Sequence, residues 1–591
     1  MAVNQKERGI ALSVKPRDVQ NFWVGQDTKV LRSRTWDRLK FEVEYSLQRG
    51  TTANSYIIEA DKIALIDPPG ESFTENYLQA VGSRLNWDQV NYIILGHFNA
   101  NRGATLKAIL AKAPDIQWVC SNPAALALRE YFQAEMAEAD FNLNILTVKG
   151  EETLNLGQGH DLRFITTPTP RWPDGLLTYD TLTRILFSDK FFGAHVCGDQ
   201  VFDEGWKVYS EDRQFYYDCL HAAQAQQVLT TLEKVANFPE VQFYAPNHGP
   251  MVRYGKAELT HLYRQWSQKQ KSQELRVALL YASAYGNTAT VAQAIARGLT
   301  KSGVAVESIN CEHASATEIQ AAIENCDGFI IGSPTLGGHA PTQIQAALGI
   351  ILNTASTQKL AGVFGSFGWS GEAIDLLAGK LKDAGFKFGF EPIRVKFKPT
   401  DITIQTCKEA AIDFAQALKR SQKRRAIRPV SATSSGADRT AQAVGRLVGS
   451  LCVMSCRRGD VESAMLASWV SQATFNPPGL TVSVAKDRAL ESLTYTGDPF
   501  VLNILEEGKS LRKHFTKQFE PGEDRFAGME TEIAKNGCVV LKQAVAYLEC
   551  SISQRMECGD HWVIYATVTN GSVLNPEGTT AVHYRKTGTY Y

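Results

Sequence analysis

Three short apolar runs, each ending in a loop rich in glycine, serine and threonine, constrain the fold of this chain more than any other feature. They cover residues 275–281, 328–331 and 360–364. Apolar runs of strand length that alternate with such loops and with helical spacing are typical of a doubly wound parallel sheet. The carboxyl ends of parallel strands lie at one edge of that sheet, so we expect the three loops to meet there and bind a ligand.

The first of these loops has the composition of a phosphate site. Ser283, Asn287 and Thr288 follow the first strand, and a helix with Val291 and Ile295 on one face comes next. Backbone amides at a helix start point outward, and serine or threonine hydroxyls donate to an anion. The loop has no lysine and no Walker pattern, which argues against a nucleoside triphosphate. Taken alone, it is also compatible with an ordinary capped helix.

The three loops together resemble the FMN site of flavodoxins, in which the first loop takes the terminal phosphate. Glycines let the backbone approach a flat ring, and Phe367 or Trp369 is expected to lie against that ring. The alternative is that Trp369 packs in a core, which is the commoner place for a tryptophan. The resemblance implies an FMN site formed by Ser283, Tyr285, Gly286, Asn287, Thr288, Pro334, Thr335, Leu336, Gly337, Ser366, Phe367, Gly368, Trp369 and Gly371.

A second informative stretch lies at residues 93–102, where a short apolar strand leads into a loop that begins with histidine. Such a loop resembles the first metal-binding loop of the metallo-β-lactamase fold, whose common pattern is His-x-Glu-x-Asp-His. This chain has His-x-Asn-x-Asn-Arg at that place. The wider resemblance is to the flavodiiron proteins of oxygenic phototrophs, in which seven ligands hold two irons. Their positions in this chain are His97, Asn99, Asn101, Arg102, Arg171, Lys190 and His248.

Five of these seven positions carry a residue of the wrong chemistry for an iron pair. Iron favours imidazoles and oxygen-rich ligands, and a guanidinium cannot lose its proton to become a ligand. Two like charges about 4 Å apart repel by roughly 4 kcal/mol at an effective dielectric of about 20. We therefore expect a redox-silent pocket that lacks the diiron centre, is filled by Arg102, Arg171 and Lys190, and holds a small anion or water. A mononuclear site on the two remaining histidines, or a true site elsewhere, is the alternative.

A basic run between residues 419 and 428 precedes small polar residues at 431–436. This composition predicts a solvated linker, because charged and small polar residues do not bury a core. Docking of the basic run to an acidic partner such as ferredoxin is the sharper alternative.

The stretch 465–486 has serine and threonine hydroxyls between two apolar runs and resembles the split-barrel flavin reductases. A second flavin is therefore expected in the C-terminal domain, near Ser468, Ser471 and Thr474. No G-x-G-x-x-G motif occurs, so NAD(P)H as electron donor would bind over the flavin without a Rossmann domain.

The three blocks cover nearly the whole chain, in the order found in flavodiiron proteins of oxygenic phototrophs. The resemblance implies a multidomain α/β protein. Its expected parts are a metallo-β-lactamase-like αββα sandwich at 1–264, a flavodoxin-like doubly wound parallel sheet at 273–420, a linker at 421–440 and a split β-barrel flavin reductase-like domain at 441–591.

The same resemblance implies an oxidoreductase that passes electrons from NAD(P)H or ferredoxin through FMN toward oxygen reduction to water, as a photoprotective electron sink. Because its metal ligands are replaced, this chain is expected to work in a head-to-tail dimer, as a homo- or hetero-oligomer with a diiron-containing homologue. The second hypothesis is a non-catalytic regulatory or structural subunit with an anion-binding pocket. A complete oxygen reductase acting alone is the third, and the replaced ligands argue against it.

Charge and composition exclude several other classes of protein. The 591 residues include 62 basic and 62 acidic ones, and a net charge of zero argues against binding nucleic acid through its phosphates. No apolar run approaches the roughly 20 residues of a membrane helix, and the N-terminus has no apolar signal core. The 11 cysteines include no CxxC pair, which is typical of reduced thiols. We expect a soluble cytoplasmic protein, with no more than a peripheral association with thylakoids.

Overall fold

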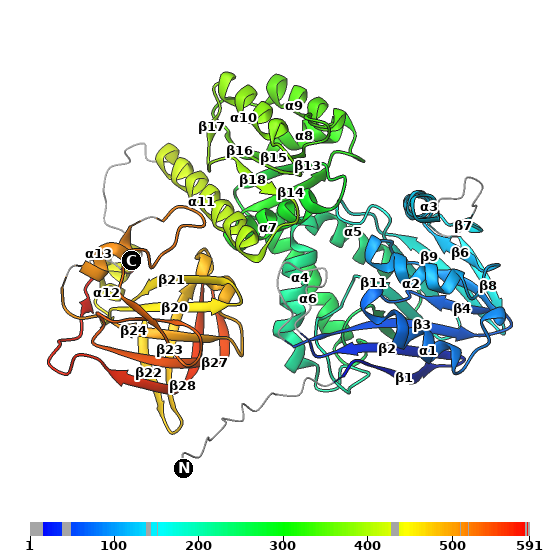
Figure 1. Cartoon of the computed structure of the whole chain (residues 1–591), viewed down its shortest axis with the longest axis horizontal. Helices are drawn as coiled ribbons and strands as arrows, with labels where there is room; N and C mark the ends of the chain where they lie inside the picture. Colours follow the sequence, from blue (N-terminus) through cyan, green and yellow to red (C-terminus); the bar gives the residue numbers. More distant parts are fainter. Residues whose placement is uncertain are drawn as a thin grey trace, which may run out of the picture. The chain divides into compact units, whose positions relative to one another are not determined.

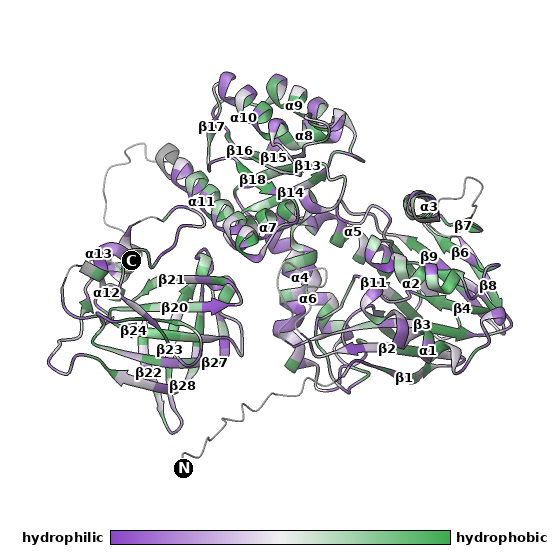
Figure 2. Cartoon of the chain, viewed as in Figure 1, coloured by the Kyte–Doolittle hydropathy of each residue, from purple (hydrophilic) through white to green (hydrophobic). Residues whose placement is uncertain are grey.

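The computed structural model describes residues 16–37, 49–136, 143–150, 152–426, 436–508, 510–517, 519–585 and 588 (Figure 1). The chain forms two compact units, Met1–Ser272 and Gln273–Tyr591. In both units the hydrophobic residues concentrate in the central strands of the sheets (Figure 2). No helix within the described ranges is long and apolar enough to cross a bilayer.

The first unit contains two sheets, of order β1-β2-β3-β4-β5-β6-β7 and β12-β11-β10-β9-β8. The strands of the larger sheet are β1 (Asp18–Gly25), β2 (Thr28–Thr35), β3 (Thr51–Glu59), β4 (Ile63–Ile66), β5 (Val90–Ile94), β6 (Gln117–Cys120) and β7 (Ile145–Thr147). Those of the smaller sheet are β8 (Thr153–Gly157), β9 (His160–Thr166), β10 (Leu176–Asp180), β11 (Ile185–Asp189) and β12 (Phe243–Pro246). The helices are α1 (Thr74–Gly82), α2 (Ala100–Leu110), α3 (Asn122–Met136), α4 (Ser210–Leu220), α5 (Ala225–Ala236) and α6 (Lys256–Lys271).

Strand residues of this unit alternate between separate cores, because successive side chains of a strand point to opposite faces of the sheet. Val30 lies in the core between the two sheets, together with Phe187 of the smaller sheet. Its neighbour Leu31 lies in the core under α1, α2 and α3, with Leu106. A third core joins the smaller sheet to α5 and α6. The predicted αββα sandwich is confirmed.

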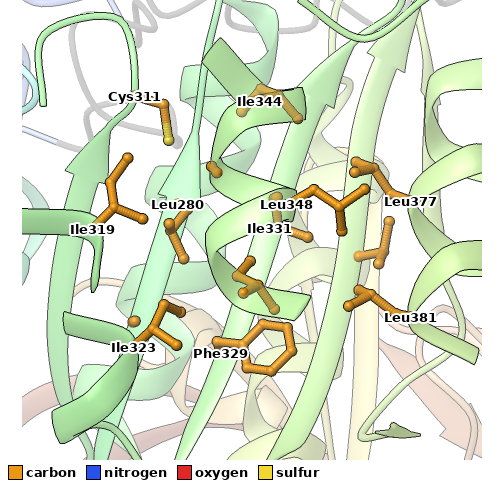
Figure 3. Close-up of a cluster of buried hydrophobic side chains, with 14 of the residues drawn as sticks. Leu280, Cys311, Ile319, Ile323, Phe329, Ile331, Ile344, Leu348, Leu377 and Leu381 are labelled. Atoms are coloured by element: carbon orange, nitrogen blue, oxygen red, sulfur yellow. The ribbon is translucent and has the colours of Figure 1, made fainter. Parts of the chain in front are cut away.

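The second unit begins with a parallel sheet of order β14-β13-β15-β16-β17, and β18 also pairs with β16. Helices cover the faces of this sheet. α8, α9 and α10 pack on one core through Ile323, Leu348 and Leu377 (Figure 3). α7 and α11 contact each other and the sheet. The predicted doubly wound sheet is confirmed. Its elements are β13 (Arg276–Tyr281), α7 (Asn287–Lys301), β14 (Ala305–Asn310), α8 (Ala316–Asn325), β15 (Gly328–Pro334), α9 (Thr342–Thr354), β16 (Leu360–Phe367), α10 (Glu372–Asp383), β17 (Lys387–Phe388), β18 (Ile393–Lys396) and α11 (Asp401–Ala426).

The rest of this unit is built on a seven-stranded antiparallel sheet of order β21-β20-β24-β27-β28-β23-β22. The end strands β21 and β22 are not paired with each other in the part of the chain that the structure describes, so the predicted split barrel is an open sheet. Two small sheets pair β19 with β29 and β25 with β26. The elements are α12 (Gly436–Val444), β19 (Gly449–Ser450), β20 (Cys452–Arg458), β21 (Val461–Ala467), β22 (Val470–Phe475), β23 (Pro478–Ala485), β24 (Pro499–Ile504), α13 (Ser510–Thr516), β25 (Thr531–Ile533), β26 (Val539–Leu541), β27 (Ala546–Cys558), β28 (His561–Val573) and β29 (Val582–His583).

Three local predictions differ from the structure. The predicted linker overlaps two helices, since α11 continues to Ala426 and α12 begins at Gly436; lysine, arginine and glutamine favour helices, and cations suit a helix C-terminus. Residues 427–435 lie outside the described residues. Arg102 lies in the first turn of α2 instead of a loop. Ser366 belongs to β16, because pairing with β15 extends that strand beyond its apolar run.

Candidate functional site

The former metal position begins at His97, which lies fully buried just beyond β5. Its Nδ1 donates to Oδ1 of Asp189 over 2.8 Å, and its Nε2 accepts from the side-chain amide of Asn99 over 3.2 Å. Burial and the charge of Arg102 lower the pKa of His97 to about 4, so the ring is neutral near pH 7. The Nε2 lone pair that a metal would need is therefore used by Asn99.

The second surviving histidine, His248, is held in a similar way. Its Nδ1 donates to the carbonyl oxygen of Thr52 over 2.6 Å, and its Nε2 faces the buried Lys190 ammonium at 3.5 Å. An ammonium has only donors, so Lys190 occupies the Nε2 lone pair of His248 that a metal would need. Within the described residues, no group of three or more His, Cys, Asp or Glu side chains is placed to hold a metal ion. These residues do not fit an iron pair, nor a single metal on the two histidines.

Arg102 is paired by Asp67, a residue that the sequence analysis missed. The guanidinium Nη1 of Arg102 donates to Oδ1 of Asp67 over 2.7 Å and to the carbonyl oxygen of His97 over 3.1 Å. Both side chains of the pair are buried. Asp67 directly follows β4 with φ of 53°, a left-handed conformation that residues other than glycine rarely adopt. The only signal in the sequence was a lone carboxylate at the end of an apolar strand.

Asp189 supplies the second counter-charge of this position. It accepts hydrogen bonds from His97 and from the side-chain amide of Asn247, and it lies 3.9 Å from Nη2 of Arg102. Burial raises the pKa of Asp189, but His97, Lys190 and Arg102 outweigh burial and hold that pKa below the ordinary carboxyl range. The position therefore contains a charge network made of the chain's own side chains.

The space left at this position is small, about 20 Å³, and its lining includes Asn101, Arg102 and His248. Such a volume holds about one water molecule or one small ion. Arg171 lies outside it: its guanidinium donates to the carbonyl oxygen of Cys219 over 3.0 Å and lies 4.7 Å from the Trp172 ring. Of the three cations predicted to fill one pocket, only Arg102 lines this space. Lys190 lies beside His248, and Arg171 contacts a carbonyl oxygen and an aromatic ring instead.

Replacement of Arg102 tests how this network stabilises the fold. Arg102→Ala leaves the buried Asp67 carboxylate without its cation, which is expected to lower the free energy of unfolding by about 3–5 kcal/mol. Denaturant unfolding of the full chain measures the loss. Arg184→Ala is the matched control: its pair with Glu240 is exposed on both sides, so its cost is expected to stay within about 1 kcal/mol. Equal losses in the two variants would contradict a buried charge network at Arg102.

The second candidate position is the edge of the parallel sheet, where the structure brings the three predicted loops together. β13, β15 and β16 are neighbours, and the loops follow their carboxyl ends. Ser283 Oγ accepts from the backbone amide of Ala289 over 3.0 Å, and the Thr288 hydroxyl lies 2.7 Å from the Ser366 hydroxyl. The first and third loops are thus joined by side chains that were predicted to bind the cofactor.

The chemistry of these loops fits a flat, phosphorylated cofactor. Thr335 Oγ1 is a buried hydroxyl for which no hydrogen-bond partner is found among the described residues. Gly286 and Gly337 have φ of 79° and 57°, with open space where a side chain would stand. Tyr285 and Trp369 are 84% and 92% exposed, so Trp369 is not a core residue and is open to a planar ring. Asn287, Pro334, Leu336, Phe367, Gly368 and Gly371 lie in the same loops or at their strand ends.

A third position is a cavity of about 420 Å³ in the second unit, which we call the α11 cavity. Ser468 lines it, whereas Ser471 is exposed on β22 and Thr474 donates to the carbonyl oxygen of Pro477. Only one of the three predicted hydroxyls therefore reaches this space, because β22 turns the others away. The wall that α11 provides was not predicted; it consists of Glu409, Ile412, Asp413 and Gln416.

Comparisons with known proteins agree with this architecture. Three family profiles match: ODP family beta lactamase over residues 51–249, flavodoxin over 279–410 and flavin reductase like domain over 444–590. The chain is 62% identical to putative diflavin flavoprotein A 6 of Nostoc sp., over 98% of this chain and 99% of that protein. It is 60% identical to putative diflavin flavoprotein A 3 of Synechocystis sp., over 98% and 96%.

A solved structure extends the comparison to three dimensions. The metal-soaked Flv1 flavodiiron core from Synechocystis sp. is 61% identical, with a TM-score of 0.67, and covers 69% of this chain and 100% of that one. The chain matches all three domain profiles, and two relatives are 62% and 60% identical to it over 98% of its length. These matches show the family. The chain belongs to the three-domain diflavin flavoproteins, a group of flavodiiron oxidoreductases.

Proposed function

We propose that this chain carries electrons from NAD(P)H or ferredoxin through flavin toward the reduction of oxygen, and that it does so with a diiron-containing homologue as partner. One observation carries the proposal: the three flavin loops are assembled at one sheet edge, while both surviving histidines of the former metal position are already bonded to protein donors. The chain's residues thus support flavin chemistry and do not support iron chemistry.

The residues at the sheet edge have separable roles. The first turn of α7 and the hydroxyl of Thr288 would hold the phosphate, and the buried Thr335 hydroxyl would donate to the ring or its side chain. Exposed Tyr285 and Trp369 would cover the ring and keep water from it. Bound FMN supplies a ring that takes up two electrons and releases them one at a time.

The finer parts of the proposal concern organisation. We propose the division 1–264, 273–420 and 441–591 for the three domains, with residues 421–440 between them, and a second flavin in the C-terminal domain. The partner is proposed to be a head-to-tail homologue that keeps its irons, because this chain lacks residues to hold them. Peripheral contact with thylakoids and ferredoxin docking belong to the same proposal.

A small anion in the former metal position has weaker support than the sequence suggested. Asp67 and Asp189 already provide two negative charges to Arg102. The remaining space of about 20 Å³ fits one water as well as one chloride. A regulatory subunit defined by an anion pocket is therefore not favoured over electron transfer.

The proposed function is tested by mixing the purified full chain with NADH or NADPH in the absence of oxygen. Bleaching of the flavin absorbance is expected, with reduced ferredoxin as a parallel donor. A chain that binds flavin but is reduced by none of the three donors would favour the non-catalytic subunit instead.

Replacement of Thr288 tests the first flavin site. Thr288→Ala removes a hydroxyl beside the phosphate position, and loss of a hydrogen bond to a charged group costs roughly 1.5–3 kcal/mol, or about one to two decades in affinity. Titration of the flavin-free full chain with FMN should show one class of site weakened by that factor. Thr290→Ala is the matched control, because the Thr290 hydroxyl donates to the Gly286 carbonyl instead. Unchanged FMN affinity in Thr288→Ala would contradict the assignment.

A further inference from the structure

A buried ionic cluster joins the flavodoxin-like part of the second unit to the flavin reductase-like part. Lys301, the last residue of α7, pairs with Glu491, which lies in the short 3₁₀ helix Ala489–Leu493. Arg555 of β27 lies 3.3 Å from the other carboxylate oxygen of Glu491. The Tyr495 hydroxyl accepts from Arg297 over 2.8 Å and from Lys301 over 3.0 Å. We call these five residues the Glu491 cluster.

The charges in this cluster are fully formed at neutral pH. Glu491 is 1% exposed. Burial raises its pKa, but Lys301 and Arg555 outweigh burial and hold the pKa at about 2. A buried carboxylate between two cations is costly to separate, because each group would be left without its partner. The cluster therefore holds α7 against the flavin reductase-like part in one geometry.

A second set of contacts comes from α11, which packs on α7. Gln405 donates to the carbonyl oxygen of Ala489 over 3.1 Å and accepts from Ser492 over the same distance. Glu409 accepts from the backbone amide of Gly522 over 2.8 Å and from Arg525 over 3.4 Å. Two neighbouring helices of the flavodoxin-like part thus contact the flavin reductase-like part through specific polar groups.

The α11 cavity lies next to these contacts, and residues of both parts line it. On one side stand Glu409, Ile412, Asp413 and Gln416 of α11, and on the other stand residues of the flavin reductase-like part, among them Ser468, Trp469, Ser483 and His583. Its volume of about 420 Å³ lies within the usual range of roughly 300–1,000 Å³ for cofactor pockets. An indole, two hydroxyls and an imidazole are the mixture of apolar and polar groups that such pockets use. Both parts therefore contribute to the lining of this space.

We propose that the second flavin binds in the α11 cavity, with α11 as one wall, so that the flavin reductase-like part retains its flavin only while docked on α7 and α11. The inference rests on the second flavin of the proposed function. It adds that the two flavin sites share α7: the first turn of this helix forms the phosphate loop, and its last turn enters the Glu491 cluster. Fifteen residues at 1.5 Å each separate the two ends by about 22 Å.

The decisive variant fills the cavity from the α11 side. In the full chain, Gln416→Trp would place an indole in the cavity without changing any residue of the flavin reductase-like part. Gln422→Trp is the matched control on the same helix, since Gln422 is exposed and lies outside the cavity. Each protein is stripped of flavin and titrated with FMN, and the number and affinity of sites are measured by calorimetry.

Wild type and Gln422→Trp are expected to bind two FMN, and Gln416→Trp only one. If wild type itself binds one, the second flavin of the proposed function is lost. If wild type and Gln416→Trp both bind two with the same affinities, the second flavin does not lie in the α11 cavity, and the inference is overturned while the proposed function stands.

Docking is tested separately with Glu491→Gln, which removes the charge between Lys301 and Arg555. The second FMN site is expected to weaken about tenfold or more, equivalent to about 1.4 kcal/mol, while the first site keeps its affinity and so reports that the chain is folded. Asp375→Asn is the matched control, because its pair with Arg394 is exposed on both sides. Equal affinity of the second site in wild type and Glu491→Gln would show that docking does not control it.

Discussion

The full-length chain, expressed with ample iron, is expected to contain far fewer than two irons per molecule by elemental analysis. Arg102 and Lys190 put cations at two positions where the family has iron ligands, and two like charges about 4 Å apart repel by roughly 4 kcal/mol at an effective dielectric of about 20. His97 and His248 use their ring nitrogens for protein hydrogen bonds. A measured content of about two irons per chain would contradict this prediction, because it would show that iron binds in spite of the charge network.

A restored variant provides the control for iron supply during expression. It carries Asn99→Glu, Asn101→Asp, Arg102→His, Arg171→His and Lys190→Asp, the residue types that the family pattern has at these positions. Iron in this variant, with none in the wild type, would assign the difference to the side chains. Iron in neither protein would leave the wild-type result without a positive control and call for reconstitution of the restored variant with ferrous iron.

Oxygen uptake by the chain alone, with NAD(P)H as donor, is expected to be slow and to yield hydrogen peroxide. Addition of an iron-loaded homologue should raise the rate at least about tenfold, equivalent to about 1.4 kcal/mol of activation free energy, and shift the product to water. The physical reason is that this chain offers electrons from flavin while its former metal position contains only its own charges. An oxygen electrode, with peroxide scored in each sample, measures both effects.

The controls separate cooperation from the homologue's own activity. The homologue is assayed alone at the same total concentration, and the mixture is expected to exceed the sum of the separate rates. Thr288→Ala in this chain should reduce the gain, since it weakens FMN at the first site. Reduction of oxygen to water by this chain alone, as fast as in the mixture, would show that it needs no partner.

Most of the fold could be predicted from local patterns in the sequence. The apolar runs before Ser283, Ser333 and Ser366 correctly placed three parallel strands, because strand length and loop composition depend on neighbouring residues. They also placed the candidate flavin loops at one edge, since parallel strands order their ends without further information. The exposure of Trp369 could not be predicted, because a tryptophan after a strand is compatible with either a core or a surface.

The sequence by itself determined that an iron pair is chemically mismatched, because residue type decides whether a side chain can ligate: Arg102 and Lys190 offer only donors. Only the tertiary structure decided what replaces the irons. Asp67 meets Arg102 across 35 positions and Asp189 meets His97 across 92, and such pairs are set by which faces of the packed sheets turn toward each other. The same holds for the Glu491 cluster, where Glu491 and Lys301 are 190 positions apart. Contacts of that range depend on how helices and sheets pack, which no local spacing in the chain encodes.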